Sequence, residues 1–128
     1  MSVDMSQFHD VLFEECLEHL DAMKSELSNM LENGFDFEKM NTAYRGAHTI
    51  KGGCAMLEFN TESTYAKELE HLLMAMRDDK ITTNAENINV MLEAVEFLRA
   101  MIVTLQNKGS NDEANALAHC AKIQAAVV

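Results

Sequence analysis

Apolar side chains recur at every third or fourth position through almost the whole chain, and no proline interrupts them in 128 residues. An α-helix turns 100° per residue, so this spacing gathers the apolar side chains on one face of a helix. Proline disfavours a helix most strongly and glycine comes next, and the chain contains only 5 glycines. No stretch alternates apolar and polar residues as a half-buried strand does. The pattern therefore predicts an all-α chain.

Turn and capping residues divide this pattern into five segments. The segments run from about Met5 to Leu31, from Asp36 to Leu57, from Glu62 to Asp78, from Asn84 to Asn107, and from Ser110 toward the end of the chain. Local signals at their ends are Asp4 or Ser6 as a cap, Asn33-Gly34 as a helix stop, Asp36 as a cap, Phe59-Asn60-Thr61 as a turn, Thr83-Asn84 as caps, and a capping box of Ser110 with Glu113.

Each segment carries one apolar face. In the first segment we expect this face to run from Phe8 to Leu31, and in the last to consist of Leu117, Cys120 and Ile123. Five amphipathic helices joined by short loops favour an antiparallel four-helix bundle with an additional C-terminal helix. The length suits one domain, residues 1–128.

Composition narrows the classes of function. A formal net charge of −11 argues against binding to nucleic acid and favours partners of complementary charge. No apolar run is long enough to span a bilayer, and the first ten residues do not resemble a signal peptide. The cysteines Cys16, Cys54 and Cys120 lie far apart on or near apolar faces, which predicts reduced, buried thiols in a cytoplasmic protein without membrane insertion.

The second segment carries the stretch with the strongest chemical signal, Ala47-His48-Thr49-Ile50-Lys51-Gly52-Gly53. On the helical arithmetic His48 points about 130° away from the middle of the apolar face, so its imidazole should face water. Lys51 follows at i+3 and Gly52 at i+4. A glycine inside a helix costs about 1 kcal/mol relative to alanine. Two glycines beside an exposed imidazole predict that something large approaches the ring.

An exposed imidazole at neutral pH is a good nitrogen nucleophile when one ring nitrogen is free and the other bears hydrogen. No second histidine or glutamate stands at a metal-ligand spacing from His48, so no metal site is predicted. A hydrolase triad lacks its strand–turn–helix context, and Lys51-Gly52-Gly53 lacks the spacing of a Walker phosphate loop. Any phosphoryl group must therefore come from another domain or protein. A surface histidine with no chemical role remains the alternative.

The same stretch resembles the A-H-[ST]-[IL]-K-G-[GS] signature of histidine phosphotransfer (HPt) domains, and Tyr44-Arg45-Gly46 resembles the F-R-A that precedes it. The strongest resemblance is to the amino-terminal HPt domain of CheA-type chemotaxis histidine kinases. It covers nearly the whole chain, including the opening Met5-Ser6-Gln7-Phe8, Phe59, and the run Glu68–Leu73. The resemblance implies a helical bundle whose signature histidine is phosphorylated.

By this resemblance His48 is the phosphoacceptor and Lys51 is the phosphate-proximal lysine. Glu70 takes the place of the acidic residue that orients the imidazole from the next helix. Lys67 stands where some relatives carry a second histidine and is expected to add positive charge to the site. Of the five histidines, only His48 is then predicted to be exposed and set between a lysine and a carboxylate.

The resemblance also implies a docking surface around the imidazole. Gly52 and Gly53 are the small residues that let a partner approach, and Ala55 and Arg45 are expected to belong to the same surface. The segment Cys54–Glu58 replaces a continuation that is rich in Gly and Phe in relatives, so the surface is expected to differ from theirs.

The resulting prediction is an HPt domain of a two-component, chemotaxis-type system. His48 takes a phosphoryl group from the ATP-binding domain of a histidine kinase and passes it to an aspartate in the receiver domain of a response regulator. The domain itself binds no cofactor; ATP and Mg²⁺ belong to the kinase domain, and the catalytic machinery lies there. The alternatives are a free-standing HPt protein of a phosphorelay and a non-catalytic helical interaction domain.

Overall fold

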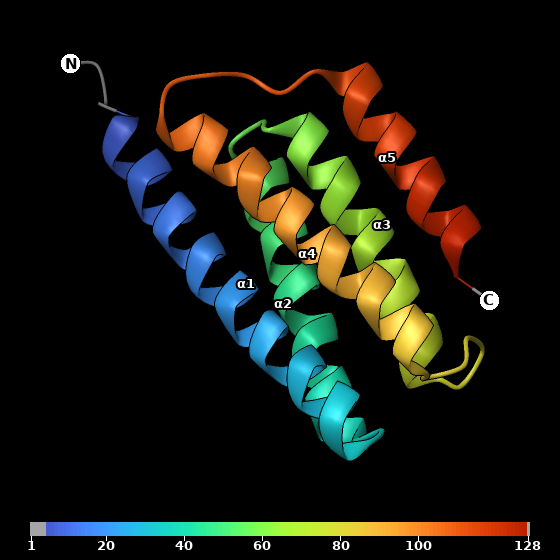
Figure 1. Cartoon of the computed structure of the whole chain (residues 1–128). Helices are drawn as coiled ribbons and strands as arrows, with labels where there is room; N and C mark the ends of the chain where they lie inside the picture. Colours follow the sequence, from blue (N-terminus) through green and yellow to red (C-terminus); the bar gives the residue numbers. More distant parts are fainter. Residues whose placement is uncertain (1–4, 128) are drawn as a thin grey trace.

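The computed structural model describes residues 5–127, and within that range it contains five α-helices and no strand (Figure 1). The helices are α1 (Ser6–Asn33), α2 (Phe37–Met56), α3 (Asn60–Arg77), α4 (Ala85–Gln106) and α5 (Glu113–Ala126). The prediction of an all-α fold is confirmed.

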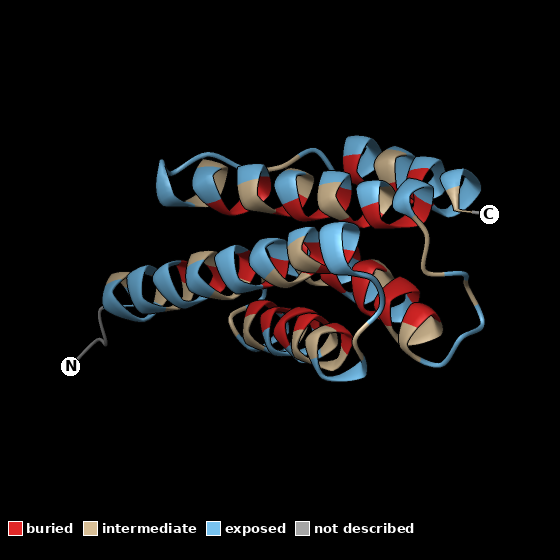
Figure 2. Ribbon diagram, turned by 60° about the horizontal axis from the view of Figure 1, so that its bottom comes forward, coloured by how far each residue is buried: buried red, intermediate tan, exposed pale blue. Residues whose placement is uncertain are grey.

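The first four helices form the bundle. α1 contacts α2 and α4, and α3 contacts the same two helices from the other side. α5 contacts only α3 and α4, and it lies outside the four-helix core (Figure 1). The architecture is therefore the predicted four-helix bundle with an additional C-terminal helix, and the faces that the helices turn toward one another are the buried ones (Figure 2).

The buried face of α1 differs from the prediction at its two ends. Phe8 is 55% exposed and Leu31 is 39% exposed. The buried residues follow one another at intervals of three and four, as Phe13, Cys16, Leu20, Met23, Leu27 and Met30. Extending this stripe backward leads to His9, so Phe8 is rotated about 100° off it, and Leu31 is rotated by the same angle from Met30. Phe13, which is 4% exposed, is the first buried residue of this stripe.

Side chains cap α2 and α4 as predicted. The Asp36 carboxylate accepts a hydrogen bond of 3.0 Å from the backbone N–H of Lys39. The Asn84 side chain accepts one of 2.8 Å from the N–H of Asn87. Each bond satisfies an N–H that the first turn of the helix leaves free. Gly34, which ends α1, has a φ of 90°, a backbone conformation that favours glycine.

The start of α3 differs from the prediction, and at α1 the predicted cap Ser6 is wrong. α3 begins at Asn60 rather than Glu62, immediately after Phe59, whose ring contacts Phe13 of α1 at 5.4 Å between centroids. At α1, Met5 holds the N-cap position without a side-chain capping bond, and Ser6 is the first helical residue. Asp4, the other predicted cap, lies outside the described residues.

The predicted capping box of α5 is also wrong. The N-cap is Asp112, whose carboxylate accepts from the N–H of Ala114 at 2.9 Å. The helix starts late because the Asn111 side chain donates to the Glu62 carboxylate at 2.6 Å and to the backbone carbonyl of Met101 at 3.0 Å. These bonds hold the linker on α3 and α4 before a helix can begin.

The inner face of α5 is formed by Ala116, Cys120 and Ile123, whereas Leu117 is 49% exposed, contrary to the prediction. All three cysteines are free and buried, as predicted. Within residues 5–127, no helix combines the length and the apolar character that crossing a membrane requires.

Candidate functional site

The site lies on the side of α2 that faces away from the core. Ala47 and Ile50 are buried and hold this part of α2 against the bundle. His48, between them in sequence, keeps 59% of its side chain exposed. The imidazole therefore stands on an anchored helix but in contact with solvent, as its helical phase predicted.

One carboxylate from α3 contacts both predicted partners on α2. Glu70 Oε1 lies 3.0 Å from His48 Nδ1, and Glu70 Oε2 lies 2.7 Å from Lys51 Nζ. The Glu70 side chain is only 7% exposed, because Leu69 and Leu73 beside it carry α3 into the core. The Ser63 hydroxyl also donates to the backbone carbonyl of Lys51 at 2.9 Å, which ties α3 to α2 beside the site.

The surroundings of Glu70 determine which ring nitrogen of His48 is free. Burial raises the pKa of the Glu70 carboxyl, but the contacts with Lys51 and His48 lower it by more, so the pKa lies below its ordinary value. Glu70 is therefore ionised at neutral pH and can only accept hydrogen bonds. It follows that His48 Nδ1 carries the hydrogen, and that the lone pair of Nε2 is free.

The remaining predicted site residues do not all share one environment. Lys67 lies on the exposed side of α3, and no ion pair is found for it in the described range. Arg45, Gly52 and Ala55 are exposed on α2. A Cβ atom added to Gly52 would meet no atom within 4 Å.

Gly53 is oriented differently from Gly52. A Cβ atom added to Gly53 would lie 2.7 Å from Leu12 Cδ1 of α1. Gly53 thus faces the contact between α1 and α2, where a small residue lets the two helices approach, whereas Gly52 faces solvent. The two glycines are adjacent in the signature, but they face different sides of α2, about 100° apart.

Two side chains near this turn of α2 were missed: Tyr44, which lies beside His48, and Arg77, which lies over the Tyr44 ring. The Tyr44 ring lies roughly parallel to the His48 ring, with 6.2 Å between centroids and 19° between planes. Arg77, the last residue of α3, places its guanidinium carbon 4.5 Å from the centre of the Tyr44 ring. The i−4 spacing of Tyr44 from His48 was a usable signal. Nothing in the sequence places the end of α3 over this turn of α2.

The other histidines test how distinctive His48 is. His71 is exposed as well, so exposure alone does not single out His48. His119 lies 3.8 Å from Glu93, which also pairs with Lys122, but the His119 side chain is only 14% exposed. Among the described residues, His48 alone combines exposure with contact to a carboxylate that also pairs with a lysine.

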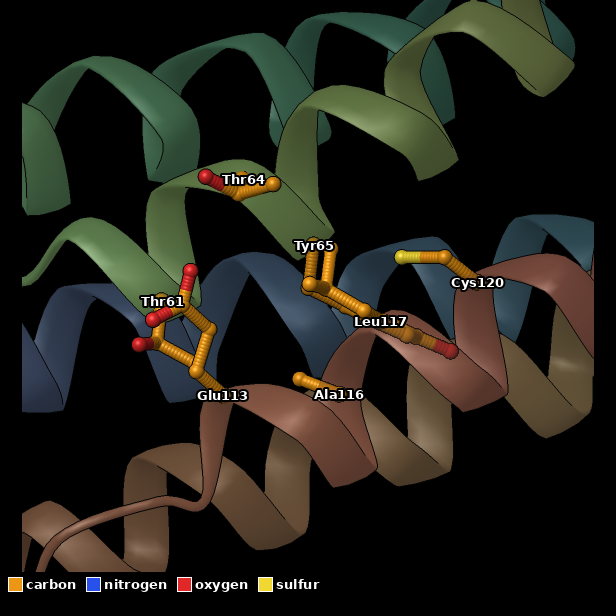
Figure 3. A pocket seen from close by; sticks show the side chains of 7 residues that line it. All are labelled: Thr61, Thr64, Tyr65, Glu113, Ala116, Leu117 and Cys120. Atoms are coloured by element: carbon orange, nitrogen blue, oxygen red, sulfur yellow. The ribbon is translucent and has the colours of Figure 1, made fainter.

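Two hollows in the described part of the chain lie apart from His48. One, between α3 and α5, has a volume of about 10 Å³, which is the space of roughly one water molecule (Figure 3). The other, of about 460 Å³, opens between the α2–α3 turn and the linker before α5, and Glu58, Glu62 and Glu113 line it. Carboxylates repel the phosphates of a nucleotide, so this groove does not suit ATP. In residues 5–127, no cluster of three or more His, Cys, Asp or Glu side chains is placed to hold a metal ion.

Comparison with known proteins places the chain in a family. A model of the Hpt domain matches residues 7–108. The chain is 30% identical over 115 residues to the chemotaxis protein CheA of Salmonella typhimurium, and 32% identical over 102 residues to that of Klebsiella aerogenes. These matches cover 90% and 80% of this chain. The chain spans only 17% and 16% of the length of these relatives.

Two solved structures share the fold. The histidine phosphotransfer domain of CheA in solution superposes with a TM-score of 0.84 at 23% identity, covering 98% of this chain and 95% of that one. The phosphorylated P1 domain of CheA3 from R. sphaeroides, in complex with CheY6, gives a TM-score of 0.82 at 24% identity, covering 94% and 95%. At sequence identities of 23% and 24%, these superpositions show that the chain shares the fold of the two structures.

Proposed function

This chain belongs to the Hpt domain family, and we propose that it carries a phosphoryl group on Nε2 of His48 between a histidine kinase and a response regulator. One observation carries the proposal. The ionised Glu70 side chain accepts the hydrogen of Nδ1 at 3.0 Å, and so leaves the lone pair of the exposed Nε2 free to attack.

In the first step, Nε2 attacks the γ-phosphorus of ATP held with Mg²⁺ in the partner's kinase domain. The bond from phosphorus to the β,γ-bridging oxygen breaks, ADP leaves, and an N–P bond forms. No proton needs to move, because Nδ1 keeps its hydrogen. The ring then bears both the phosphoryl group and the N–H, so it carries a positive charge, which the Glu70 carboxylate stabilises across the 3.0 Å contact.

In the second step, an aspartate carboxylate of a receiver domain attacks the phosphorus and the N–P bond breaks. The leaving group is a neutral imidazole, because Nδ1 is already protonated. The hydrogen that Glu70 holds on Nδ1 thus serves both steps. Lys51, which pairs with Glu70 at 2.7 Å and lies one turn from His48, keeps Glu70 ionised and adds positive charge near the phosphoryl group. We assign Lys67 the weaker role of adding charge at the edge of the site.

Several features support these partners. The exposed Gly52, Ala55 and Arg45 leave the face of α2 around His48 open. A structural neighbour is a phosphorylated P1 domain in complex with CheY6. The relatives are chemotaxis CheA proteins, which favours a CheA-type kinase in the cytoplasm over a free-standing phosphorelay protein.

Incubation with a kinase domain of CheA type, Mg²⁺ and radiolabelled ATP tests the proposal. We expect an acid-labile, alkali-stable label on the wild-type chain and none on His48→Gln. His71→Gln is the matched control, because His71 is also an exposed histidine, and it should be labelled like the wild type. Equal labelling of His48→Gln would refute the site. Absence of label on the wild type would favour a non-catalytic interaction domain.

A further inference from the structure

The turn of α2 that precedes His48 carries an aromatic contact that the signature does not explain. Tyr44, at i−4, lies with its ring 6.2 Å from the His48 ring and tilted from it by only 19°. The guanidinium carbon of Arg77 lies 4.5 Å from the centre of the same Tyr44 ring. Tyr44 therefore connects the imidazole to the end of α3.

Arg77 is itself held in place. Its Nη1 donates to the Asn41 side chain at 3.1 Å, one turn before Tyr44 on α2. Its Nε and Nη2 donate to the two carboxylate oxygens of Asp78 at 3.0 and 3.3 Å. Only 20% of the Arg77 side chain is exposed. A planar guanidinium fixed at three of its nitrogens can hold an aromatic ring by stacking, which a lysine ammonium cannot do in the same way.

The single hydrogen bond to Glu70 does not by itself fix the orientation of the His48 ring. A bond at Nδ1 fixes one atom of the ring, but the plane can still tilt about the N–H···O direction. In-line attack requires the lone pair of Nε2 to point at the phosphorus, and a displacement of about 1 Å can cost 10²-fold in rate. A second contact on the ring is therefore needed, and Tyr44 is the aromatic side chain that the structure places beside it.

We propose that Tyr44, held by Arg77, is a positioning residue that keeps the His48 ring aligned for phosphoryl transfer. The inference rests on the proposed function, since it concerns the same nitrogen. It makes the end of α3 part of the site, through a path from Asp78 and Arg77 to Tyr44 and then to His48.

The test measures phosphorylation by a CheA-type kinase domain over a range of domain concentrations, so that kcat and KM are separated. An aromatic contact of this kind corresponds to a rate effect of about threefold to tenfold. We expect kcat to fall by that factor in Tyr44→Ala and Tyr44→Leu with KM unchanged, and Tyr44→Phe to restore kcat because it keeps the ring. Tyr44→Leu retains apolar volume and serves if Tyr44→Ala does not fold.

A small-molecule phosphoryl donor distinguishes an effect on the alignment of the His48 ring from an effect on docking of the kinase domain. With phosphoramidate, the imidazole attacks phosphorus, the P–N bond of the donor breaks, and ammonia leaves without any partner protein. If Tyr44 positions the ring, Tyr44→Leu should react more slowly here as well. A defect seen only as a higher KM with the kinase domain would make Tyr44 a docking contact and overturn the inference.

Two substitutions distinguish geometry from charge at Arg77. Arg77→Gln removes the positive charge and the planar guanidinium with its several N–H donors. Arg77→Lys keeps the charge but loses those donors and the flat group that stacks on Tyr44. We expect both to lower kcat by about twofold to threefold. Full activity of Arg77→Lys beside a slow Arg77→Gln would show that the charge acts directly on phosphate, and would remove Arg77 from the positioning role.

Matched controls exist elsewhere in the bundle. Arg99→Gln removes a half-buried arginine that pairs with Asp21 of α1, and Phe97→Ala removes a ring stacked on His119 at 3.9 Å. Both should phosphorylate at the wild-type rate per folded molecule. A wild-type kcat in Tyr44→Ala, with label still confined to His48, would refute the positioning role alone. A wild type without label on His48 would refute the proposed function and this inference together.

Discussion

Gly52→Gln separates the effect of a side chain on the fold from its effect on a docking partner. Gly52 lies on the exposed side of α2, and a Cβ atom added there would meet no atom within 4 Å. Its backbone is part of a regular helix with no positive φ. Neither packing nor backbone conformation therefore requires a glycine at this position.

The expected change in stability follows from helix propensity. Replacing a helical glycine by a good helix former is worth about 0.5 to 1 kcal/mol. For a domain of this size that corresponds to a rise in Tm of roughly 2 to 6 °C. Thermal unfolding followed by circular dichroism measures the shift. A fall in Tm would mean that Gly52 takes part in packing that the structure does not show.

The expected change in function has the opposite sign. Gly52 lies one helical turn beyond His48, about 6 Å along the axis. Reacting atoms must come within about 3 to 3.5 Å of each other, so a receiver domain has to lie close over this turn. A glutamine there should slow transfer from phosphorylated His48 to the receiver by tenfold or more, measured by loss of label from the domain. Unchanged transfer would show that the partner does not cross α2 at Gly52.

Gly46 provides the matched control on the same helix. A Cβ atom added to Gly46 would lie 2.9 Å from both Cγ and Sδ of Met23 on α1. Gly46→Ala should therefore destabilise the fold by about 1 to 3 kcal/mol, because the core is already filled there. Its transfer rate per folded molecule should be unchanged. The two substitutions are thus expected to shift Tm in opposite directions, and only Gly52→Gln is expected to slow transfer. Shifts in Tm of the same sign, or equally slow transfer in both variants, would contradict the reasoning.

Two further predictions concern pH. Glu70→Gln should lower the free energy of unfolding by about 1 to 3 kcal/mol at pH 7. Burial raises the pKa of Glu70, but the contacts with Lys51 and His48 lower it by more, so it stays below its ordinary 4.5. The difference in unfolding free energy between Glu70→Gln and the wild type, measured by urea unfolding at each pH, should therefore shrink and then vanish as the pH falls below 4.5. A difference that persists at low pH would contradict the ion pair. Burial lowers the pKa of His119, whose Nδ1 lies 2.8 Å from the Tyr65 hydroxyl and whose Nε2 faces Glu93, so the unfolded chain binds the proton more readily. Stability should therefore fall as pH drops below 6.5, and His119→Gln, in the same unfolding series, should show a shallower fall.

The fold was largely predictable because helix phase depends on local sequence. The spacing of three and four identified all five helices, and Asp36 and Asn84 capped theirs as expected. The errors fell at helix ends, where one residue changes the facing direction by 100°. Phe8 and Leu117 are apolar, but each lies about 100° off the buried stripe of its helix. The sequence does not directly say which of two adjacent faces a neighbouring helix covers.

The site was predictable to the extent that it lies on one helix. Exposure of His48 and the proximity of Lys51 follow from positions on α2 alone. The contact with Glu70 came from resemblance to a family, since no periodicity relates residues on different helices. The contact between Arg77 and Tyr44 was missed for the same reason, because it depends on where the last turn of α3 lies against α2.

The open construction of the site follows from what the proposed chemistry demands. The same atom, Nε2 of His48, has to meet a kinase in one step and a receiver domain in the next, so an enclosing pocket would exclude at least one of them. The activating groups for phosphorus can then be supplied by whichever partner is docked. What this domain must provide is a hydrogen kept on Nδ1 and a ring held in one plane. A carboxylate that is 7% exposed can supply the first from below the ring without obstructing either partner, which is why Glu70 lies beneath the surface and His48 on it.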